Sequence, residues 1–312
     1  MDDVFLGIDT SNYTTSVALY FRDKKAVIQR KRLLPVHKGE LGLRQSDAVF
    51  HHTQQLPDLL EDLWTQAYQI QAVGVSVRPR DVNGSYMPCF SVGTGMARVI
   101  AKTHHVPLYA FSHQGGHVAA ALYGADCMDL LSAPFIAFHV SGGTTEALLV
   151  RPDTETIFTS EMISCSLDLK AGQAVDRVGG MLGLSFPAGK ELEKLALQWK
   201  QSCKVRPSIK GDDFSLSGIE NQCQRRLSEG HPKEEVARFC LDSILAALDV
   251  VCQMLLKKYG NIPLLFAGGV MSNSIIRETL TCRYGAHFAP PEYAADNAAG
   301  IAVLTAMKEG QL

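Results

Sequence analysis

The sequence lacks closely spaced pairs of cysteines. Its 8 cysteines are scattered over 312 residues without a C-x-x-C spacing, which argues against a disulfide framework and against a zinc ribbon. No apolar run reaches the roughly 20 residues that a membrane-spanning helix needs, and no basic and apolar leader precedes the first expected strand. We therefore expect a soluble, cytoplasmic protein with reduced thiols and no membrane partner.

Net charge is also nearly absent. The 30 Lys and Arg residues almost balance the 32 Asp and Glu residues, which leaves a formal net charge of −2. The chain as a whole therefore offers no electrostatic attraction for nucleic acid. An RNA partner would need a local basic patch or another subunit. The apolar content of 46% is ordinary for a globular protein, and the length is sufficient for two buried cores.

Two histidines four residues apart are the first chemical signal. If the segment that carries His113 and His117 is helical, both side chains lie on one face and can reach one divalent cation. Asp296 can complete a two-histidine, one-carboxylate site, which suits Fe²⁺ or, less selectively, Zn²⁺. The alternative for Asp296 is a helix N-cap. Taken together with the two histidines, Asp296 is favoured as a ligand.

A second signal is the turn Ser141-Gly142-Gly143-Thr144, which follows an apolar stretch that reads as a buried strand. Its bare backbone can aim amide N–H groups at a phosphate. A metal beside such a phosphate cradle is the chemistry of nucleotide-dependent group transfer.

An internal repeat predicts the architecture. Residues 5–20 align with residues 135–150, with Ser11 on Ser141, and each run reads as strand, polar turn, strand. This duplicated hairpin is the signature of the actin, Hsp70 and sugar-kinase fold (ASKHA, ribonuclease H-like), an α/β fold with two lobes around a nucleotide cleft.

The repeat also predicts the domain borders. We expect an N-terminal lobe at 1–132, with a C-terminal helix at about 294–312 packing back on it, and a C-terminal lobe at 133–293. The polar stretch 204–217 is the best candidate for a mobile insertion.

Further polar positions lie in turns and on helices. Asp176 is on a glycine-flanked helix, where a carboxylate can hold a ribose. Gly268 and Gly269, at a strand-to-helix turn, allow a flat base to approach, and Asn273 can hydrogen-bond its edge. The polar loop 78–85 follows a strand at its carboxyl end, where open α/β sheets bind ligands.

Six segments resemble, in order, those of the bacterial TsaD (Gcp) family, the tRNA adenosine threonylcarbamoyltransferases once called O-sialoglycoprotein endopeptidases. These segments, which span nearly the whole chain, are Gly7-Ile8-Asp9-Thr10-Ser11, His113–His117, Val140-Ser141-Gly142-Gly143, the Asp176 helix with Phe186-Pro187-Ala188-Gly189, Gly268-Gly269-Val270-Met271-Ser272-Asn273, and Asp296-Asn297-Ala298-Ala299.

The resemblance implies an acyltransferase that moves a threonylcarbamoyl group from an adenylate to the exocyclic amine of the tRNA adenosine next to the anticodon. It implies a metal held by His113, His117 and Asp296. The expected nucleotide or substrate site comprises His139, Val140, Ser141, Gly142, Gly143, Asp176, Gly189, Gly268, Gly269 and Asn273. The candidate catalytic groups are Asp9, Ser11 and Glu146.

The implied cofactors are one divalent metal and either ATP or threonylcarbamoyl-AMP, with Mg²⁺ as a further candidate. The implied partners are a nucleotide, tRNA bound through partner subunits, and either a TsaB-like heterodimer partner or a second copy of the chain.

The sequence departs from the family pattern where the acceptor would enter. Tyr13 and Thr14 stand where the family has Asp and Glu, Thr144 replaces a histidine, and loop 78–85 replaces Gly-Pro-Gly. These differences suggest a divergent paralogue. Two alternatives stay open: carbamoyl transfer to a smaller acceptor, which Tyr13, Thr14 and Thr15 would face, and a non-catalytic nucleotide-binding scaffold. A protease is not supported, because H-x-x-x-H lacks the glutamate of H-E-x-x-H.

Overall fold

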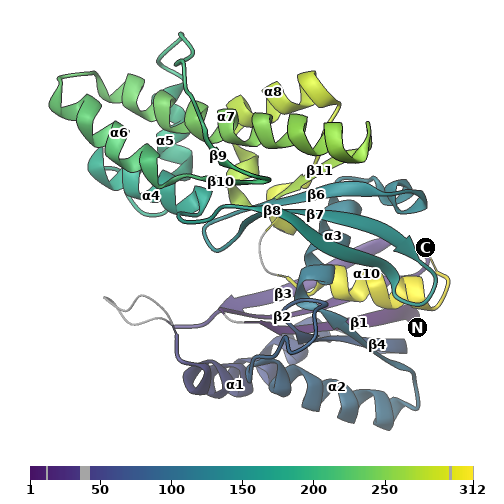
Figure 1. The fold of residues 1–312 in the computed structure, drawn as a ribbon. Helices are drawn as coiled ribbons and strands as arrows, with labels where there is room; N and C mark the ends of the chain where they lie inside the picture. Colours follow the sequence, from purple (N-terminus) through teal and green to yellow (C-terminus); the bar gives the residue numbers. More distant parts are fainter. Residues whose placement is uncertain (12, 36–42, 295–296, 312) are drawn as a thin grey trace. The chain divides into compact units, whose positions relative to one another are not determined.

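The computed structural model describes residues 1–11, 13–35, 43–294 and 297–311 (Figure 1). These residues fall into two compact units, and each unit is described by itself. Unit 1 consists of Met1–Met128, Asp153–Thr159 and Glu292–Leu312, and unit 2 of Asp129–Pro152 and Ser160–Pro291.

Unit 1 is built on a five-stranded sheet with the order β3-β2-β1-β4-β5. β2 is antiparallel to both of its neighbours, whereas β4 is parallel to β1 and β5 is parallel to β4. The strands are β1 (Asp2–Ser11), β2 (Thr14–Phe21), β3 (Ala26–Leu33), β4 (Tyr68–Arg78) and β5 (Leu108–Ser112).

Helices cover both faces of this sheet, because successive side chains of a strand point to opposite sides. Leu6 and Ile8 of β1 share an apolar cluster with side chains of α1 and α2. Phe5, which precedes Leu6 and points to the other face, packs with residues of α10. The helices of unit 1 are α1 (Gln45–Leu63), α2 (Phe90–His104), α3 (His113–Gly124) and α10 (Ala299–Lys308).

Unit 2 repeats this sheet with the order β12-β11-β6-β7-β8. Its strands are β6 (Phe135–Val140), β7 (Thr145–Asp153), β8 (Ile157–Cys165), β11 (Leu264–Ala267) and β12 (His287–Phe288). β6 and β7 form an antiparallel hairpin, and β11 and β12 continue the sheet in parallel, as β4 and β5 do in unit 1. The register also repeats, since Phe5 lies opposite Tyr20 and Phe135 lies opposite Val150. The predicted internal repeat is therefore confirmed.

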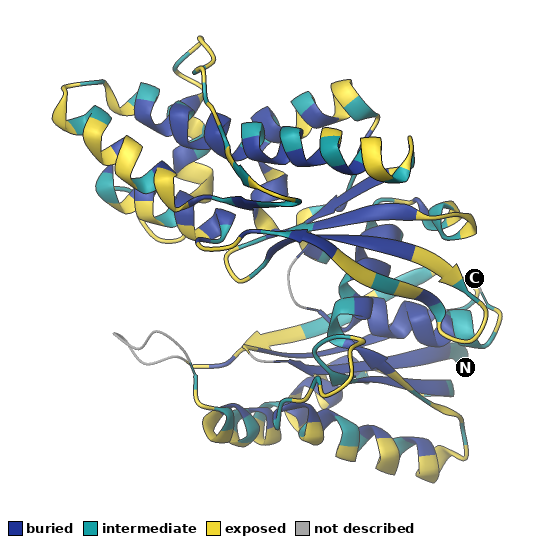
Figure 2. Cartoon of the chain, in the orientation of Figure 1, coloured by how far each residue is buried: buried dark blue, intermediate teal, exposed yellow. Residues whose placement is uncertain are grey.

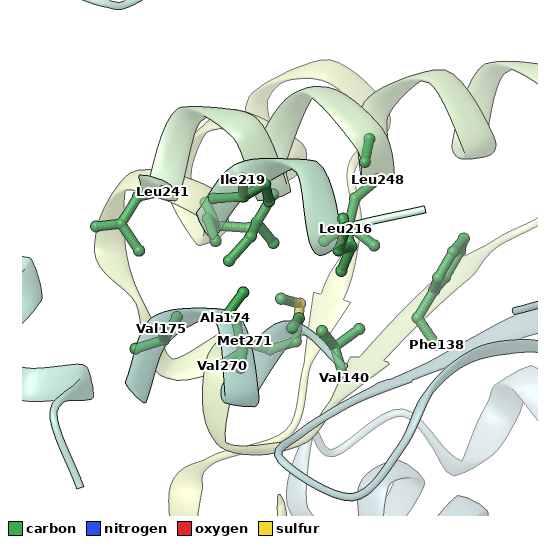
Figure 3. Close-up of a cluster of buried hydrophobic side chains, with 14 of the residues drawn as sticks. Phe138, Val140, Ala174, Val175, Leu216, Ile219, Leu241, Leu248, Val270 and Met271 are labelled. Carbon is green, nitrogen blue, oxygen red and sulfur yellow. The ribbon is translucent and has the colours of Figure 1, made fainter. Parts of the chain in front are cut away.

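The core of unit 2 forms where helices pack on this sheet (Figure 2). Leu248 of α7, Ala174 of α4 and Val140 at the end of β6 belong to one apolar cluster (Figure 3). The helices are α4 (Ala171–Met181), α5 (Gly189–Ala196), α6 (Ser217–Ser228), α7 (Lys233–Tyr259) and α8 (Ser274–Tyr284).

α7 corrects one expectation from the sequence. By length and composition this 27-residue helix could cross a membrane, contrary to the prediction that no apolar run is long enough. However, 67% of its most apolar 18-residue window is buried inside the protein. A helix that is apolar on most sides is typical of a buried core position as well as of a membrane span, and the packing of α7 is that of a core helix.

The polar stretch 204–217 also differs from its prediction as a mobile insertion. It contains a small antiparallel sheet formed by β9 (Ser208–Lys210) and β10 (Asp213–Ser215). Phe214 of β10 is 2% exposed and belongs to the unit 2 core. One buried aromatic side chain thus fastens a segment whose composition is otherwise polar.

Asp168 holds the start of α6. Its Oδ1 accepts hydrogen bonds from the N–H of Leu169 at 2.6 Å and of Leu216 at 2.8 Å, and its Oδ2 accepts from the Ser217 hydroxyl at 2.6 Å. Burial raises the pKa of Asp168, but the hydrogen bonds favour the charged carboxylate and together lower the pKa to about 2.

We expect Asp168 to stabilise the fold above about pH 4 and to lose this contribution as the pH falls toward about 2. The unfolded chain, with an Asp pKa of about 3.9, binds the proton first, so the free energy of unfolding declines through this window. Because the side chain is exposed, the effect should stay below about 1 kcal/mol. Urea unfolding across this pH range should show a shallower decline for Asp168→Asn than for wild type. The control is Asp23→Asn, which changes an exposed turn, and equal slopes for wild type and Asp168→Asn would contradict the prediction.

Candidate functional site

The predicted histidine pair lies at the start of α3. β5 ends at Ser112, whose Oγ accepts the Gly115 N–H at 3.0 Å and caps the helix. α3 begins at His113, so His117 lies one turn further on the same helix. The Nε2 atoms of His113 and His117 are 2.9 Å apart, and the ring centroids are 4.3 Å apart. Both histidines therefore direct Nε2 to the same place.

This geometry fits a shared metal ion. Two nitrogen ligands at about 2.05 Å from a metal, at right angles to each other, are about 2.9 Å apart. The other ring nitrogen of His113, Nδ1, lies 2.8 Å from Oδ2 of Asp9. A carboxylate on the far nitrogen of a ligating histidine fixes its tautomer and orientation. When Nδ1 of His113 donates its proton to Asp9, the lone pair of the ring lies on Nε2, the atom that faces Nε2 of His117.

Asp9 is held firmly in this position. It is 1% exposed, at the carboxyl end of β1. Its Oδ1 accepts a 2.5 Å hydrogen bond from Ser76, and Oδ2 accepts a 3.1 Å bond from Ser11. Asp9 and Ser11, both candidate catalytic residues, are therefore parts of the support for His113. Ser76 could not be identified from the sequence, because a serine within an apolar strand is common.

The third predicted ligand, Asp296, lies outside the described residues. Among the residues that the structure describes, no group of three His, Cys, Asp or Glu side chains is arranged to hold a metal. The described part of the site thus contains two candidate nitrogen ligands and a carboxylate that contacts one of them.

The first hairpin turn differs from its prediction. Thr15 is fully buried, and its Oγ1 lies 2.8 Å from Nδ1 of His52 and 2.9 Å from Oε1 of Gln55, both on α1. Burial lowers the pKa of His52 to about 4. Thr14 is also buried, whereas Tyr13 is 37% exposed. The expectation that all three side chains face a substrate is therefore wrong for the two threonines.

In unit 2, the predicted phosphate turn follows β6. The Ser141 N–H donates to the Thr144 carbonyl at 2.7 Å, and the Ser141 carbonyl accepts from the Gly172 N–H at 3.1 Å. Gly142 and Gly143 between them are exposed, and a Cβ on either would meet no atom within 4 Å. The turn is thus anchored at its ends and open at its glycines, where an anion could approach the backbone.

Gly268 has a structural explanation of its own. Its φ is +104°, and a Cβ there would overlap the carbonyl oxygen of Val140 and lie 2.8 Å from the Val140 nitrogen. The lack of a side chain thus permits backbone contact between the ends of β11 and β6. At Gly269, by contrast, a Cβ would lie in open space. Of the two glycines predicted to admit a base, only Gly269 borders open space.

Asn273 and Asp176 both have partners within unit 2. Asn273 is 7% exposed and is the N-cap of α8, where its Oδ1 accepts the Ile276 N–H at 3.2 Å. Its Nδ2 is the group that could meet a ligand. Oδ1 of Asp176 accepts the N–H of Ala188 at 2.9 Å, which places this carboxylate beside Gly189, the first residue of α5.

The remaining two predicted residues lie on the second hairpin. His139 on β6 is opposite Glu146 on β7. Glu146 is 5% exposed, whereas His139 is half-buried. The unit 2 members of the predicted nucleotide site therefore come from the ends of β6 and β11 and from the starts of α5 and α8, together with Asp176 within α4.

Sequence relatives cover almost the whole chain. A family model described as TsaD, tRNA N6-adenosine threonylcarbamoyltransferase, matches residues 33–303. The tRNA N6-adenosine threonylcarbamoyltransferase of Thermus thermophilus is 30% identical, and the match covers 96% of this chain and 90% of that protein. The enzyme of the same name from Oenococcus oeni is 29% identical over the same shares.

Solved structures share the fold at much lower identity. Full-length HypF in its phosphate- and nucleotide-bound form is 12% identical with a TM-score of 0.60, and the match covers 99% of this chain but only 55% of HypF. Component A of the (R)-2-hydroxyglutaryl-CoA dehydratase from Acidaminococcus fermentans is 16% identical with a TM-score of 0.55, covering 98% of this chain and 99% of that one. The predicted actin-like α/β fold is therefore confirmed.

Proposed function

The chain belongs to the TsaD family of tRNA N6-adenosine threonylcarbamoyltransferases, and we propose that it transfers a threonylcarbamoyl group to the exocyclic amine of the tRNA adenosine next to the anticodon. As a member of this family it is a transferase. The proposed donor is threonylcarbamoyl-AMP, and the proposed cofactors are one divalent metal, Fe²⁺ or Zn²⁺, with ATP or Mg²⁺ as further candidates at the nucleotide site.

The observation that carries the metal-dependent part is the histidine pair. His113 and His117 aim Nε2 atoms at one point, 2.9 Å apart, and the buried Asp9 orients His113 through Nδ1. These two histidines would hold the metal, with Asp296 as the proposed third ligand. A metal bound there would supply Lewis-acid polarisation of an acyl or phosphoryl oxygen.

The residues of unit 2 support the nucleotide part. The open turn at Gly142 and Gly143 would let backbone N–H groups bind a phosphate, and Asn273 Nδ2 can donate to a base or ribose. Preorganised donors of this kind stabilise the charge that develops on a leaving phosphate. Asp9 and Ser11 would keep the metal ligands in place rather than exchange protons with the substrate.

Purified full-length protein tests this proposal directly. It is incubated with threonylcarbamoyl-AMP and tRNA that lacks the modification, alone and with added partner subunits from the same cell. Mass spectrometry of the digested tRNA should show threonylcarbamoyladenosine, and elemental analysis of the wild-type protein should show about one bound metal. If the modified nucleoside is absent both with and without partner subunits, although the protein has bound metal, the assignment of tRNA as the acceptor is contradicted.

The sequence differs from the family pattern at Tyr13, Thr144 and loop 78–85, and the same assay can test whether these differences change the acceptor. Small amines offered in place of tRNA should remain unmodified. A small acceptor that is carbamoylated faster than tRNA would contradict the proposed substrate while leaving the metal and nucleotide proposals in place.

We propose a cytoplasmic location and a TsaB-like or identical partner subunit on the basis of the family alone.

A further inference from the structure

The loop that follows β4 is tied to the first turn of α3. Asp81 in this loop accepts a hydrogen bond from the Ser112 hydroxyl, with 2.6 Å between Oδ2 and Oγ. The same Oγ accepts the Gly115 N–H at 3.0 Å as the helix cap. A backbone bond runs alongside, from the Gln114 N–H to the Pro79 carbonyl at 3.0 Å. Side-chain and main-chain contacts thus join the same two segments.

Arg78 fixes the other side of the carboxylate. Its Nη2 and Nε lie 2.7 Å and 3.1 Å from Oδ1 of Asp81. The two oxygens of Asp81 therefore have separate partners, the guanidinium on Oδ1 and the hydroxyl on Oδ2. Both guanidinium donors converge on Oδ1, so the two oxygens of Asp81 are held by different partners and Oδ2 is the one that accepts from Ser112.

We propose that Asp81 is a positioning residue of the metal site, acting through Ser112 on the helix that carries His113 and His117. The inference rests on the metal-dependent function proposed above. A serine hydroxyl has one hydrogen to donate. When that hydrogen goes to Asp81, the oxygen lone pairs remain for the Gly115 N–H, so the carboxylate selects the hydroxyl orientation that caps α3.

The cap matters for the metal because His113 is the next residue after Ser112. The His113 ring has to meet Asp9 at 2.8 Å and His117 at 2.9 Å at the same time. A small rotation of the first turn would separate the two Nε2 atoms, which lie on successive turns of the helix. A serine N-cap also works without a carboxylate partner, so the test has to separate the contribution of Asp81 from that of the cap.

Zn²⁺ titration of the metal-free full chain, in competition with a chromophoric chelator, tests this role. Asp81→Ala should weaken Zn²⁺ binding about tenfold, as outer-shell changes do, and Ser112→Ala should weaken it at least as much. Because the two residues act in series, the double variant should lose no more than the larger single loss. Ser112→Thr keeps the hydroxyl and should bind as wild type does. The matched control is Asp23→Asn, which should leave the affinity unchanged.

The outcomes separate this proposal from the proposed function. Unchanged affinity in Asp81→Ala, with affinity lost in His113→Ala, overturns the positioning role and leaves the metal site intact. Unchanged affinity in His113→Ala overturns the metal site itself and the positioning role with it. A lower melting temperature of metal-free Asp81→Ala without a change in affinity shows a structural role only and also overturns the proposal. If Asp81→Ala does not fold, the Zn²⁺ affinities of Ser112→Ala, Ser112→Thr and Asp81→Asn are compared instead. Weaker binding in Ser112→Ala and Asp81→Asn, with wild-type binding in Ser112→Thr, supports the positioning role, and unchanged binding in all three variants overturns it.

Discussion

Alanine at position 113 is expected to lower metal affinity by more than about 100-fold and to reduce threonylcarbamoyl transfer to background. Changes to groups that only support a metal ligand cost about 10–100-fold, and His113 is a proposed ligand. Its two nitrogens meet His117 at 2.9 Å and Asp9 at 2.8 Å, so the substitution removes one ligand and leaves a buried carboxylate without its imidazole. Elemental analysis and the tRNA assay, run on the same preparation, measure both effects.

Two further variants provide an intermediate effect on metal affinity and a control. Asp9→Asn keeps both histidines but loses the charge that orients His113, so its metal affinity should fall by only about 10–100-fold. His104→Ala removes an exposed histidine from α2 and should behave as wild type. A His113→Ala protein that retains metal and activity would show that the histidine pair is not the metal site.

Alanine in place of Gly300 is expected to destabilise unit 1 by about 3 kcal/mol. α10 meets α3 at this glycine, where an added Cβ would overlap the carbonyl oxygen of Gly116 and lie 2.7 Å from the nitrogen of Ala120. Backbone atoms cannot rotate away as a side chain can, so the two helices would have to separate. Overpacking of this kind typically costs about 1–3 kcal/mol and occasionally more. Urea unfolding followed by circular dichroism measures the change.

Gly95→Ala is the matched control for this substitution. Gly95 lies on the exposed side of α2, and a Cβ there would meet nothing within 4 Å. The change should therefore raise stability by about 0.5–1 kcal/mol, because alanine favours the helix over the unfolded chain. If Gly300→Ala proved as stable as Gly95→Ala, the close approach of α10 and α3 would be wrong.

The fold could be predicted because the strand-turn-strand pattern that indicates it lies within a short stretch of sequence and occurs twice. The hairpin that carries Ser11 and the hairpin that carries Ser141 each show an apolar strand, a polar turn and a second strand within about 16 residues. One such hairpin is common, but two in the same register imply the same sheet in both halves. The histidine pair was predictable for the same reason, since four residues along a helix are one turn.

The support around the site could not be predicted, since it depends on contacts between distant segments. Asp81 meets Ser112 across 31 positions, and Ser76 meets Asp9 across 67. Residues this far apart in the sequence meet because of the register of three parallel strands and the path of one loop. For Asn273, the amide side chain suggested a contact with a ligand, but its position just before α8 also makes it the N-cap of that helix. A polar side chain just before a helix was the available signal for both this cap and Ser112.

Unit 1 is assembled from both ends of the chain, and this has a consequence for synthesis on the ribosome. Domains generally fold in the order in which they are translated. Phe5, Ala18 and Tyr20, however, share their apolar cluster with Ala302, Val303 and Ala306 of α10, which follow all of unit 2 in the sequence. One face of the first sheet thus stays uncovered while all of unit 2 is translated. The helix that carries His113 and His117 gains its packing partner at Gly300 only after unit 2 has been made, so a product that stops within unit 2 lacks this support for α3.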